Sequence, residues 1–195
     1  MTEFIHLRVK SSYSLLQSAL KIEQITERCK KLNMPAVALT DHDNLFAMLE
    51  FSMAASKAGI QPIHGTIITI EDQGEYGEIL LLAKNQTGYH NLLKLVSHIY
   101  TNPDIKNNHH ILFSTLEKYQ DGLILLSGYT EGLIGKALLE NKEGQAKLYI
   151  ERFYEIFGDR FYLEIMRHKL ATEQKIEQQY IELASQYQIP LVATN

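Results

Sequence analysis

Residues 34–45, MPAVALTDHDNL, decide the fold of this chain. The apolar run at residues 36–39 does not alternate with polar residues, which is typical of a strand buried on both faces. Pro35 opens the run, and a strand tolerates proline at its first residue because the missing N–H matters least there. Five polar residues end the run, and Asn44 among them is expected to be the N-cap of a helix that begins near Leu45.

The same stretch places a candidate site. Asp41 and His42 follow directly after the carboxyl end of the predicted strand. In α/β folds, ligands and metals bind at this end of the strands. The two side chains therefore have two interpretations: metal ligands, or polar groups of a turn held by hydrogen bonds. A catalytic metal usually has three or more protein ligands, so two residues alone favour the turn.

The composition is that of a globular domain. The chain has 195 residues, of which 45% are hydrophobic and 22% are charged. This is enough for one domain with a sizeable core, or for the front part of a longer protein. The formal net charge is -4 and the basic residues are scattered, which does not favour a basic nucleic-acid surface. Any contact with DNA is therefore expected through other domains.

The chain also carries signals of its cellular location. Cys29 is the only cysteine, which excludes a disulfide framework and fits a reducing compartment. No apolar run approaches the roughly 18 residues that a membrane span needs. The N-terminus lacks the basic start and the apolar region of a signal peptide. These features predict a cytoplasmic protein with no membrane partner.

Seven short apolar segments alternate with helical patterns. Helical spacing of apolar residues predicts helices from about residue 21, at 45–58, 132–139 and 142–157, and around residues 92–99 and 176–183. Residues 71–77 are expected to form a polar turn, and residues 101–110 a solvated loop. Repeated strand–helix alternation predicts parallel pairing with right-handed crossovers. The expected strands are residues 4–9, 34–40, 61–70, 78–83, 123–126, 161–164 and 189–193.

A distorted barrel is favoured over an open sheet. Residues 10–14, after the first strand, contain no glycine, whereas nucleotide-binding open sheets carry a glycine-rich phosphate loop at this position. No helix follows the last predicted strand, so we expect the natural chain to continue beyond Asn195.

Several single residues have structural interpretations. Cys29, Met48 and Met53 are expected to pack in the core. His64 is expected to be a core residue with a hydrogen bond, and His168 to lie at the rim of the candidate site.

Seven segments spread over the whole chain resemble one family in its own order. The resemblance is to the polymerase and histidinol phosphatase (PHP) domain that begins bacterial DNA polymerase III alpha subunits. It implies a distorted seven-stranded (βα)7 TIM-like barrel, which agrees with the strand count, and a PHP domain over residues 1–195. The segments are residues 4–9, 11–16, 34–45, 58–65, 81–92, 161–165 and 189–195.

The resemblance also implies a site. In active PHP domains, His, Asp and Glu at the strand ends hold up to three metals, which support phosphoester hydrolysis or proofreading. Here only Asp41 and His42 match, Glu78 is a possible ligand near a histidine position, and the final Asp-x-His would lie beyond Asn195. The site is therefore expected to be vestigial, with no cofactor in this domain. The replaced ligand positions are Arg8 and Lys10 for the first-strand His-x-His, and Gln17, Ile67 and Tyr129 for the others.

Two cations at ligand positions suggest that positively charged side chains take the place of metal ions. Arg8 and Lys10 are expected to replace the lost metals by pairing with Asp41, Glu78 or Glu164, because buried cations need partners.

The function implied by the resemblance is that of a scaffold. The domain is expected to be catalytically inactive, to support the remainder of the polymerase chain, and to dock the separate proofreading exonuclease subunit. DNA synthesis with Mg2+ would belong to domains beyond this fragment. One alternative is a metal-dependent PHP phosphoesterase or proofreading nuclease, which would need the missing His-x-His. A further alternative is an unrelated barrel enzyme.

Overall fold

Strand β1 (Ala36–His42) stands at one end of the strand order of the sheet and is buried on both faces, as its apolar run predicts. We describe a computed structural model, which covers residues 4–101 and 109–195. The other strands are β2 (Gln61–Asp72), β3 (Glu75–Ala83), β4 (Ile111–Leu112), β5 (Leu123–Leu126), β6 (Phe161–Ile165) and β7 (Leu191–Ala193). The helices are α1 (Ile22–Lys31), α2 (Met48–Ala58), α3 (Gln86–Thr101), α4 (Phe113–Lys118), α5 (Leu133–Leu139), α6 (Glu143–Phe157) and α7 (Ala171–Gln186), with 3-10 turns η1 (Tyr129–Glu131) and η2 (Gly158–Arg160).

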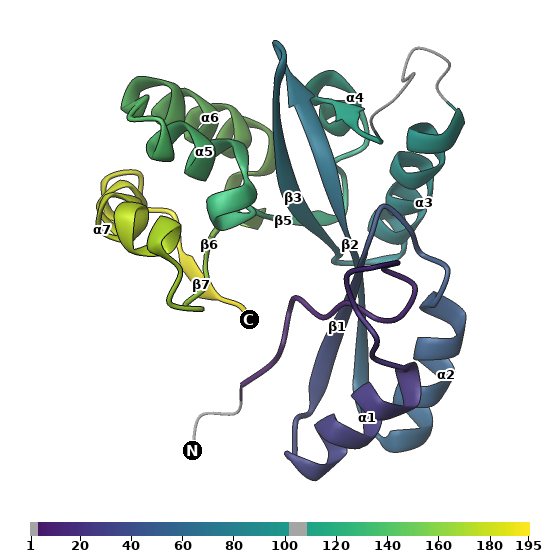
Figure 1. Ribbon diagram of the computed structural model, residues 1–195. Helices are drawn as coiled ribbons and strands as arrows, with labels where there is room; N and C mark the ends of the chain where they lie inside the picture. The colour runs from purple at the N-terminus through teal and green to yellow at the C-terminus, as the bar shows by residue number, and fades with distance from the viewer. Residues whose placement is uncertain (1–3, 102–108) are drawn as a thin grey trace.

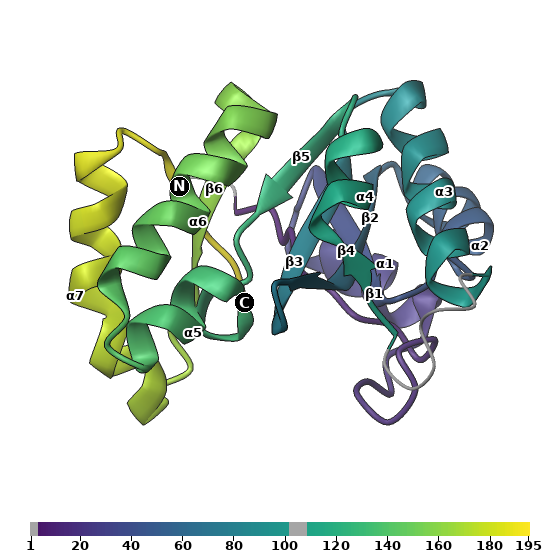
Figure 2. The ribbon, with the colours of Figure 1, turned by 90° about the horizontal axis from the view of Figure 1, so that it is seen from above.

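The strands form one curled sheet in the order β1-β2-β3-β5-β6-β7, with β4 beside β2 (Figure 1). Seen from above, α5, α6 and α7 lie on one side of the molecule, and α2, α3 and α4 lie on the other (Figure 2). This curled α/β arrangement confirms the predicted class, a distorted TIM-like barrel. Residues 102–108, most of the predicted solvated loop, lie outside the described residues.

The prediction of all-parallel pairing is wrong at β3. This strand is antiparallel to both β2 and β5, whereas β1–β2, β5–β6 and β6–β7 are parallel pairs. The predicted turn at residues 71–77 is mostly strand, and the chain reverses at Gln73 and Gly74, where φ is 53° and 88°. Two residues with positive φ form a tight hairpin, and a hairpin leaves no room for the crossover that a parallel pair needs.

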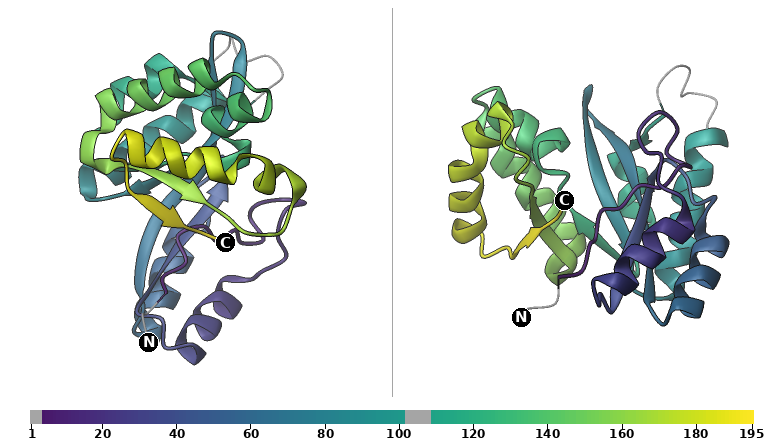
Figure 3. Two further views of the ribbon diagram at one scale, coloured as in Figure 1. Left: turned by 90° about the vertical axis from the view of Figure 1, so that its left-hand side faces the viewer. Right: turned by 60° about the horizontal axis from the view of Figure 1, so that its bottom comes forward.

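The first predicted strand is also wrong in detail. Residues 4–9 run beside β1 and make one isolated bridge, His6 with Val37. Two further bonds join the segments: the N–H of Ala38 donates to the oxygen of His6, and the N–H of Thr40 donates to that of Val9, both at 2.8 Å. Between residues 4–10 and β7, the described chain has no backbone hydrogen bond. The segment lies between β1 and β7 (Figure 3). Because it makes no backbone hydrogen bond to β7 within the described residues, the barrel is open between this segment and β7, and we call this opening the seam.

The core has an inner and an outer part. Inside the curl, apolar side chains of β1, β2, β3 and β5 form one cluster, including Ala38, Ile67 and Leu80. Outside it, α1 and α2 pack on β1, and the later helices pack on the rest of the sheet. This packing fixes the strand ends that carry the candidate site.

Two helix boundaries test the expected caps. Gly59 ends α2 in the left-handed conformation (φ 74°), as its position predicts. Asn44 does not cap α2, which begins only at Met48. Instead, the Asn44 side chain accepts the N–H of Phe46 at 3.2 Å and donates to the carbonyl oxygens of Tyr13 and His42. Asparagine satisfies its own local turn first, so the helix starts later.

The predictions for single residues are confirmed at some positions and wrong at one. Cys29 and Met48 are buried, as expected, whereas Met53 is 67% exposed on α2. His64 is half-buried with its Nε2 2.7 Å from the Ser52 hydroxyl, which confirms the expected hydrogen bond. Among the described residues, no helix is long and apolar enough to cross a membrane.

Candidate functional site

Four ionisable side chains meet at the mouth of the curled sheet. Arg8 comes from the N-terminal segment, His42 from the end of β1, Glu78 from β3 and Glu164 from β6. Glu164 faces the interior because alternate residues of a strand point to opposite faces. This is the end of the sheet at which Asp41 and His42 were expected to lie.

Glu164 is fully buried, and both of its carboxylate oxygens accept hydrogen bonds. Its Oε1 accepts Arg8 Nε at 2.7 Å and the Thr194 hydroxyl at 2.5 Å. Its Oε2 accepts Arg8 Nη2 at 2.9 Å and the backbone N–H of Gly128 at 3.1 Å. Both carboxylate oxygens are therefore engaged, with the two-pronged geometry that makes Arg–carboxylate pairs strong.

Arg8 also reaches Glu78. The Arg8 Nη1 lies 3.7 Å from Glu78 Oε2. Burial alone would lower the pKa of Arg8, but the charges and hydrogen bonds of Glu164 and Glu78 outweigh it and raise the pKa. The guanidinium is thus a permanent positive charge between two acids.

His42 is a second cation of the mouth. Its Nδ1 lies 2.9 Å from Asp43 Oδ2 and its Nε2 3.4 Å from Glu78 Oε1. Hydrogen bonds to Asp43 and then to Glu78 raise the pKa of His42 to about 9, against the opposing effect of burial. Burial raises the pKa of Glu78, but the hydrogen bond and charge of His42, with Arg8 and Lys10, outweigh it and lower that pKa.

These contacts form a chain of alternating charge. From one end to the other it runs Asp43, His42, Glu78, Arg8 and Glu164. Each cation lies between two acids, so every Coulombic contact along the chain is attractive. We call these five residues the mouth network.

Asp41 stands apart from the mouth network. It is fully buried, and its carboxylate accepts three hydrogen bonds, from the Ser11 N–H at 2.7 Å and from the Ser11 and Ser14 hydroxyls at 2.6 Å each. The Ser14 oxygen in turn accepts the N–H of His42 at 3.1 Å. Asp41 therefore ties residues 11–14 to the end of β1, which is the hydrogen-bonded turn of the two interpretations.

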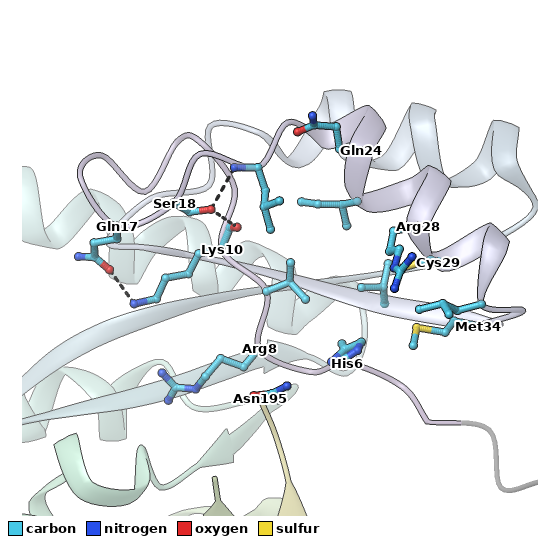
Figure 4. A pocket seen from close by; sticks show the side chains of 15 residues that line it. His6, Arg8, Lys10, Gln17, Ser18, Gln24, Arg28, Cys29, Met34 and Asn195 are labelled. Atoms are coloured by element: carbon cyan, nitrogen blue, oxygen red, sulfur yellow. Dashed lines mark hydrogen bonds between the residues drawn. The ribbon is translucent and has the colours of Figure 1, made fainter. Parts of the chain in front are cut away.

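Lys10 does not make the predicted ion pair. Its Nζ donates to Gln17 Oε1 at 2.6 Å (Figure 4), since the Asp41 oxygens are already taken by serines. Two other replaced positions hold core side chains, although Ile67 pairs in register with His42. Ile67 belongs to the inner core, and Tyr129 is buried edge-on against Tyr180 with ring centroids 5.2 Å apart.

The structure adds residues that the sequence did not single out. Thr194 and Gly128 complete the shell of Glu164, and Asp43 holds His42. Gly128 is required by space as well as by its φ of 77°, because a Cβ there would lie 2.1 Å from the carbonyl oxygen of Glu78. Asp43 is also in the left-handed region (φ 57°), and its Oδ1 is buried without a hydrogen-bond partner.

His168 was expected to lie at the rim of the candidate site, but its contact in the structure is with Glu173. The ring of His168 pairs with Glu173, with Nδ1 2.9 Å from Oε1, and neither joins the mouth network. Within residues 4–101 and 109–195, no group of three or more His, Cys, Asp and Glu side chains is arranged to hold a metal ion.

A curled α/β sheet with polar side chains gathered at its strand ends defines a class of protein, the distorted TIM-like barrels. The PHP domain model matches residues 6–168, and the chain belongs to the PHP domain family. Across its whole length the chain is 56% identical to the DNA polymerase III subunit alpha of Rickettsia bellii, of which it covers 17%. It is 40% identical over 210 residues to the same subunit of Borreliella burgdorferi, of which it covers 18%. The chain thus spans about a sixth of the length of these relatives.

Solved structures share the fold at low identity. An amidohydrolase from Chromobacterium violaceum with bound sulfate and no metal matches with a TM-score of 0.66 at 13% identity, over 98% of this chain and 86% of that one. A two-domain protein from Bacteroides vulgatus that contains a predicted PHP-like metal-dependent phosphoesterase matches with a TM-score of 0.52 at 12% identity, over 98% and 50%. At this identity the likeness establishes the fold.

Proposed function

We propose that residues 1–195 are the N-terminal PHP domain of a longer DNA polymerase III alpha chain. The support is the identity of 56% and 40% to such subunits, which extends over the whole chain and falls on about a sixth of their length. The complete protein would extend DNA at the replication fork, with its Mg2+-dependent catalytic residues in the part that follows.

The natural reading frame tests this assignment. It should encode a chain about six times as long as this one, by the coverage of the relatives, and the purified product should extend a primed DNA template with Mg2+. A frame that ends shortly after Asn195, or a long product without primer extension, would contradict the assignment.

Within this polymerase, we propose that the PHP domain is a scaffold without hydrolytic activity. The observation that carries the proposal is Arg8, which lies between Glu164 and Glu78 at the mouth. Arg8 has no lone pair to offer a metal and is always charged. Together with the His42 imidazolium it supplies positive charge where metal ions would otherwise be needed to neutralise the acids.

The oxygens at the mouth do not fit a metal cluster. Both oxygens of Glu164 and both of Asp41 already accept hydrogen bonds from protein donors. The His42 nitrogens face Asp43 and Glu78, whose hydrogen bonds raise the pKa of His42 to about 9, so a metal would have to displace a proton that these two acids stabilise. A metal would have to break these contacts before it gained ligands of its own.

Metal analysis with an activity assay tests the scaffold proposal. Protein purified without chelator should contain no stoichiometric Mn, Zn or Fe. It should not hydrolyse a phosphodiester such as bis(p-nitrophenyl) phosphate when these metals are added. The Arg8→Met variant, which removes the guanidinium from the mouth, should also stay inactive, because the ligand set is still incomplete.

A metal-dependent phosphoesterase or proofreading nuclease is the second candidate. It is favoured by the phosphoesterase named in the Bacteroides vulgatus neighbour. Several metals per chain, with turnover that a chelator removes, would establish this candidate and overturn the scaffold.

The domain would also dock a partner. We propose that it holds the proofreading exonuclease subunit on the polymerase, an inference that rests on the family resemblance alone. Co-purification of that subunit with the full polymerase, and its loss when residues 1–195 are deleted from a chain that still extends primers, is the expected result. Retention of the subunit by the deleted chain would remove the proposal.

A further inference from the structure

Large apolar side chains are exposed on the outer face of α2. Leu49 and Met53 are 75% and 67% exposed, and Phe46, in the turn before the helix, is 70% exposed. Leu49 and Met53 are four residues apart, so they share one face of the helix. The opposite face of α2 packs on β1. The outer face is therefore an apolar stripe that the described residues leave in water.

The loop between the N-terminal segment and α1 extends this stripe. It lies beside the beginning of α2 (Figure 1), where the Tyr13 hydroxyl donates to Glu50 Oε2 at 3.1 Å. Leu15 and Leu16 in this loop are 81% and 107% exposed, and Leu16 has a left-handed backbone (φ 63°). Three hydrogen bonds to the buried Asp41 fix the loop. The two leucines are thus presented to solvent on a firm support.

The loop and the helix together expose the area of a stable interface. We call this the α2 surface, and it consists of Leu15, Leu16, Phe46, Leu49 and Met53. With roughly 150–250 Å2 for a large side chain, the exposed parts amount to about 800 Å2. One partner of a standard protein interface contributes about 800 Å2. An exposed apolar patch of this size is typical of a protein–protein contact.

The charges beside the apolar stripe of α2 are complementary to those of a second copy. Glu50 and Lys57 are seven residues apart, about two helical turns, so they lie along one edge of the exposed face. Met53 lies between them. When two copies of α2 pack antiparallel about a two-fold axis near Met53, Glu50 of each copy comes opposite Lys57 of the other. Within the described residues, Lys57 makes no ion pair.

We propose that the α2 surface binds a second copy of this chain. In the dimer the two α2 helices cross antiparallel at Met53, with a Glu50–Lys57 pair on each side and the leucines of the loop at the edges. Two-fold symmetry lets one patch serve both partners. The inference uses only α2 and the loop beside it, so it does not depend on the polymerase assignment.

Charge reversal in the natural full-length chain tests the pairing. An interface of this size binds at micromolar or lower concentrations, so the chain at about 50 µM should sediment with twice the monomer mass. Glu50→Lys and Lys57→Glu should each weaken the dimer at least about tenfold, because each turns two attractive contacts into repulsive ones. The double variant Glu50→Lys/Lys57→Glu should recover the wild-type affinity. The two single variants, mixed, should form a mixed dimer, since one carries two cations and the other two acids.

Apolar substitutions provide the matched control. Leu49→Asp should abolish the dimer, whereas Leu148→Asp, at a position 43% exposed on α6, should leave it intact. Urea unfolding checks that both variants stay folded. A monomer at this concentration, as when another protein or another segment covers the α2 surface, would overturn the inference. So would a dimer that survives Leu49→Asp, or single reversals that the double variant does not rescue. Primer extension by the same samples checks the polymerase assignment separately.

Discussion

Asp41 and Glu164 are both fully buried acids at the ends of strands, and the protein holds them in different ways. Asp41 accepts only from neutral donors, two serine hydroxyls and one N–H. Glu164 is bound by the Arg8 guanidinium, which comes from 156 residues away in the sequence. Asp41 therefore organises a local turn, whereas Glu164 ties the N-terminal segment across the seam to β6.

The comparison bears on the scaffold proposal, in which protein cations take the place of metal ions at the mouth. A metal cluster would join several strand ends at once. Here the tie across the seam falls on one ion pair, with Glu78 and His42 extending it. The largest energetic effects should therefore come from Arg8 and smaller ones from the rest of the mouth.

Arg8→Met should have the largest effect on stability. It leaves the Glu164 charge buried without its cation, and breaking a buried pair in this way costs about 3–5 kcal/mol. Urea unfolding of the 195-residue chain measures the loss. The double variant Arg8→Met/Glu164→Met should recover most of it, because no charge is then left uncompensated. A single variant that loses less than about 1 kcal/mol would show that the pair does not hold the seam.

Asp41→Asn should cost less, about 2 kcal/mol. The amide has one oxygen in place of two, so at least one of the three donors that now bind Asp41 loses its acceptor. Ser14→Ala removes one donor to Asp41 and also the acceptor of the His42 N–H, and should cost about 1–2 kcal/mol by the same measurement. If Asp41→Asn proves as costly as Arg8→Met, the distinction between the local turn and the seam is lost.

The pH dependence of stability should come from His42. Its pKa is raised to about 9 in the folded chain, so its contribution is fully present below the unfolded pKa of about 6.5 and is lost as the pH rises through 9. We expect about 1–2 kcal/mol of stability to be lost over this interval, discounted because Glu78 is partly exposed. Urea unfolding from pH 6 to pH 10 measures it, and His42→Gln should remove most of the slope. An unchanged slope in that variant would place the titrating group elsewhere.

Much of the fold could be predicted from local pattern. The buried run of β1 and the glycine after α2 each act within a few residues, so the sequence shows them directly. The hairpin was missed because Gln73 and Gly74 lie inside a polar stretch that also suits a longer turn. Residues 4–9 alternate like a strand, but pairing on one side only leaves them mostly outside the sheet.

The candidate site was predictable only in part, because its contacts join residues that are far apart in the sequence. The resemblance placed Arg8 at a ligand position, and its charge then predicted an acidic partner among Asp41, Glu78 and Glu164. Arg8 pairs with the latter two. A signal for Asp41 was present in the two serines at residues 11 and 14, three apart in a polar turn. Thr194 gave no such signal, because it reaches Glu164 only through the packing of β7 on β6.

Lys10→Ala should have the smallest effect, a change below about 0.5 kcal/mol. Lys10 donates to the neutral Gln17 at an exposed contact, whereas Arg8 bonds a fully buried acid. The two cations both stand at ligand positions of the family, yet the losses of stability from removing them should differ at least about sixfold. Urea unfolding of the two variants side by side measures this ratio. A loss from Lys10→Ala that approaches the loss from Arg8→Met would mean that Lys10 turns inward in solution and joins the mouth network. The positive charge at the mouth would then be shared by both residues, as we expected from the family ligand positions that they occupy.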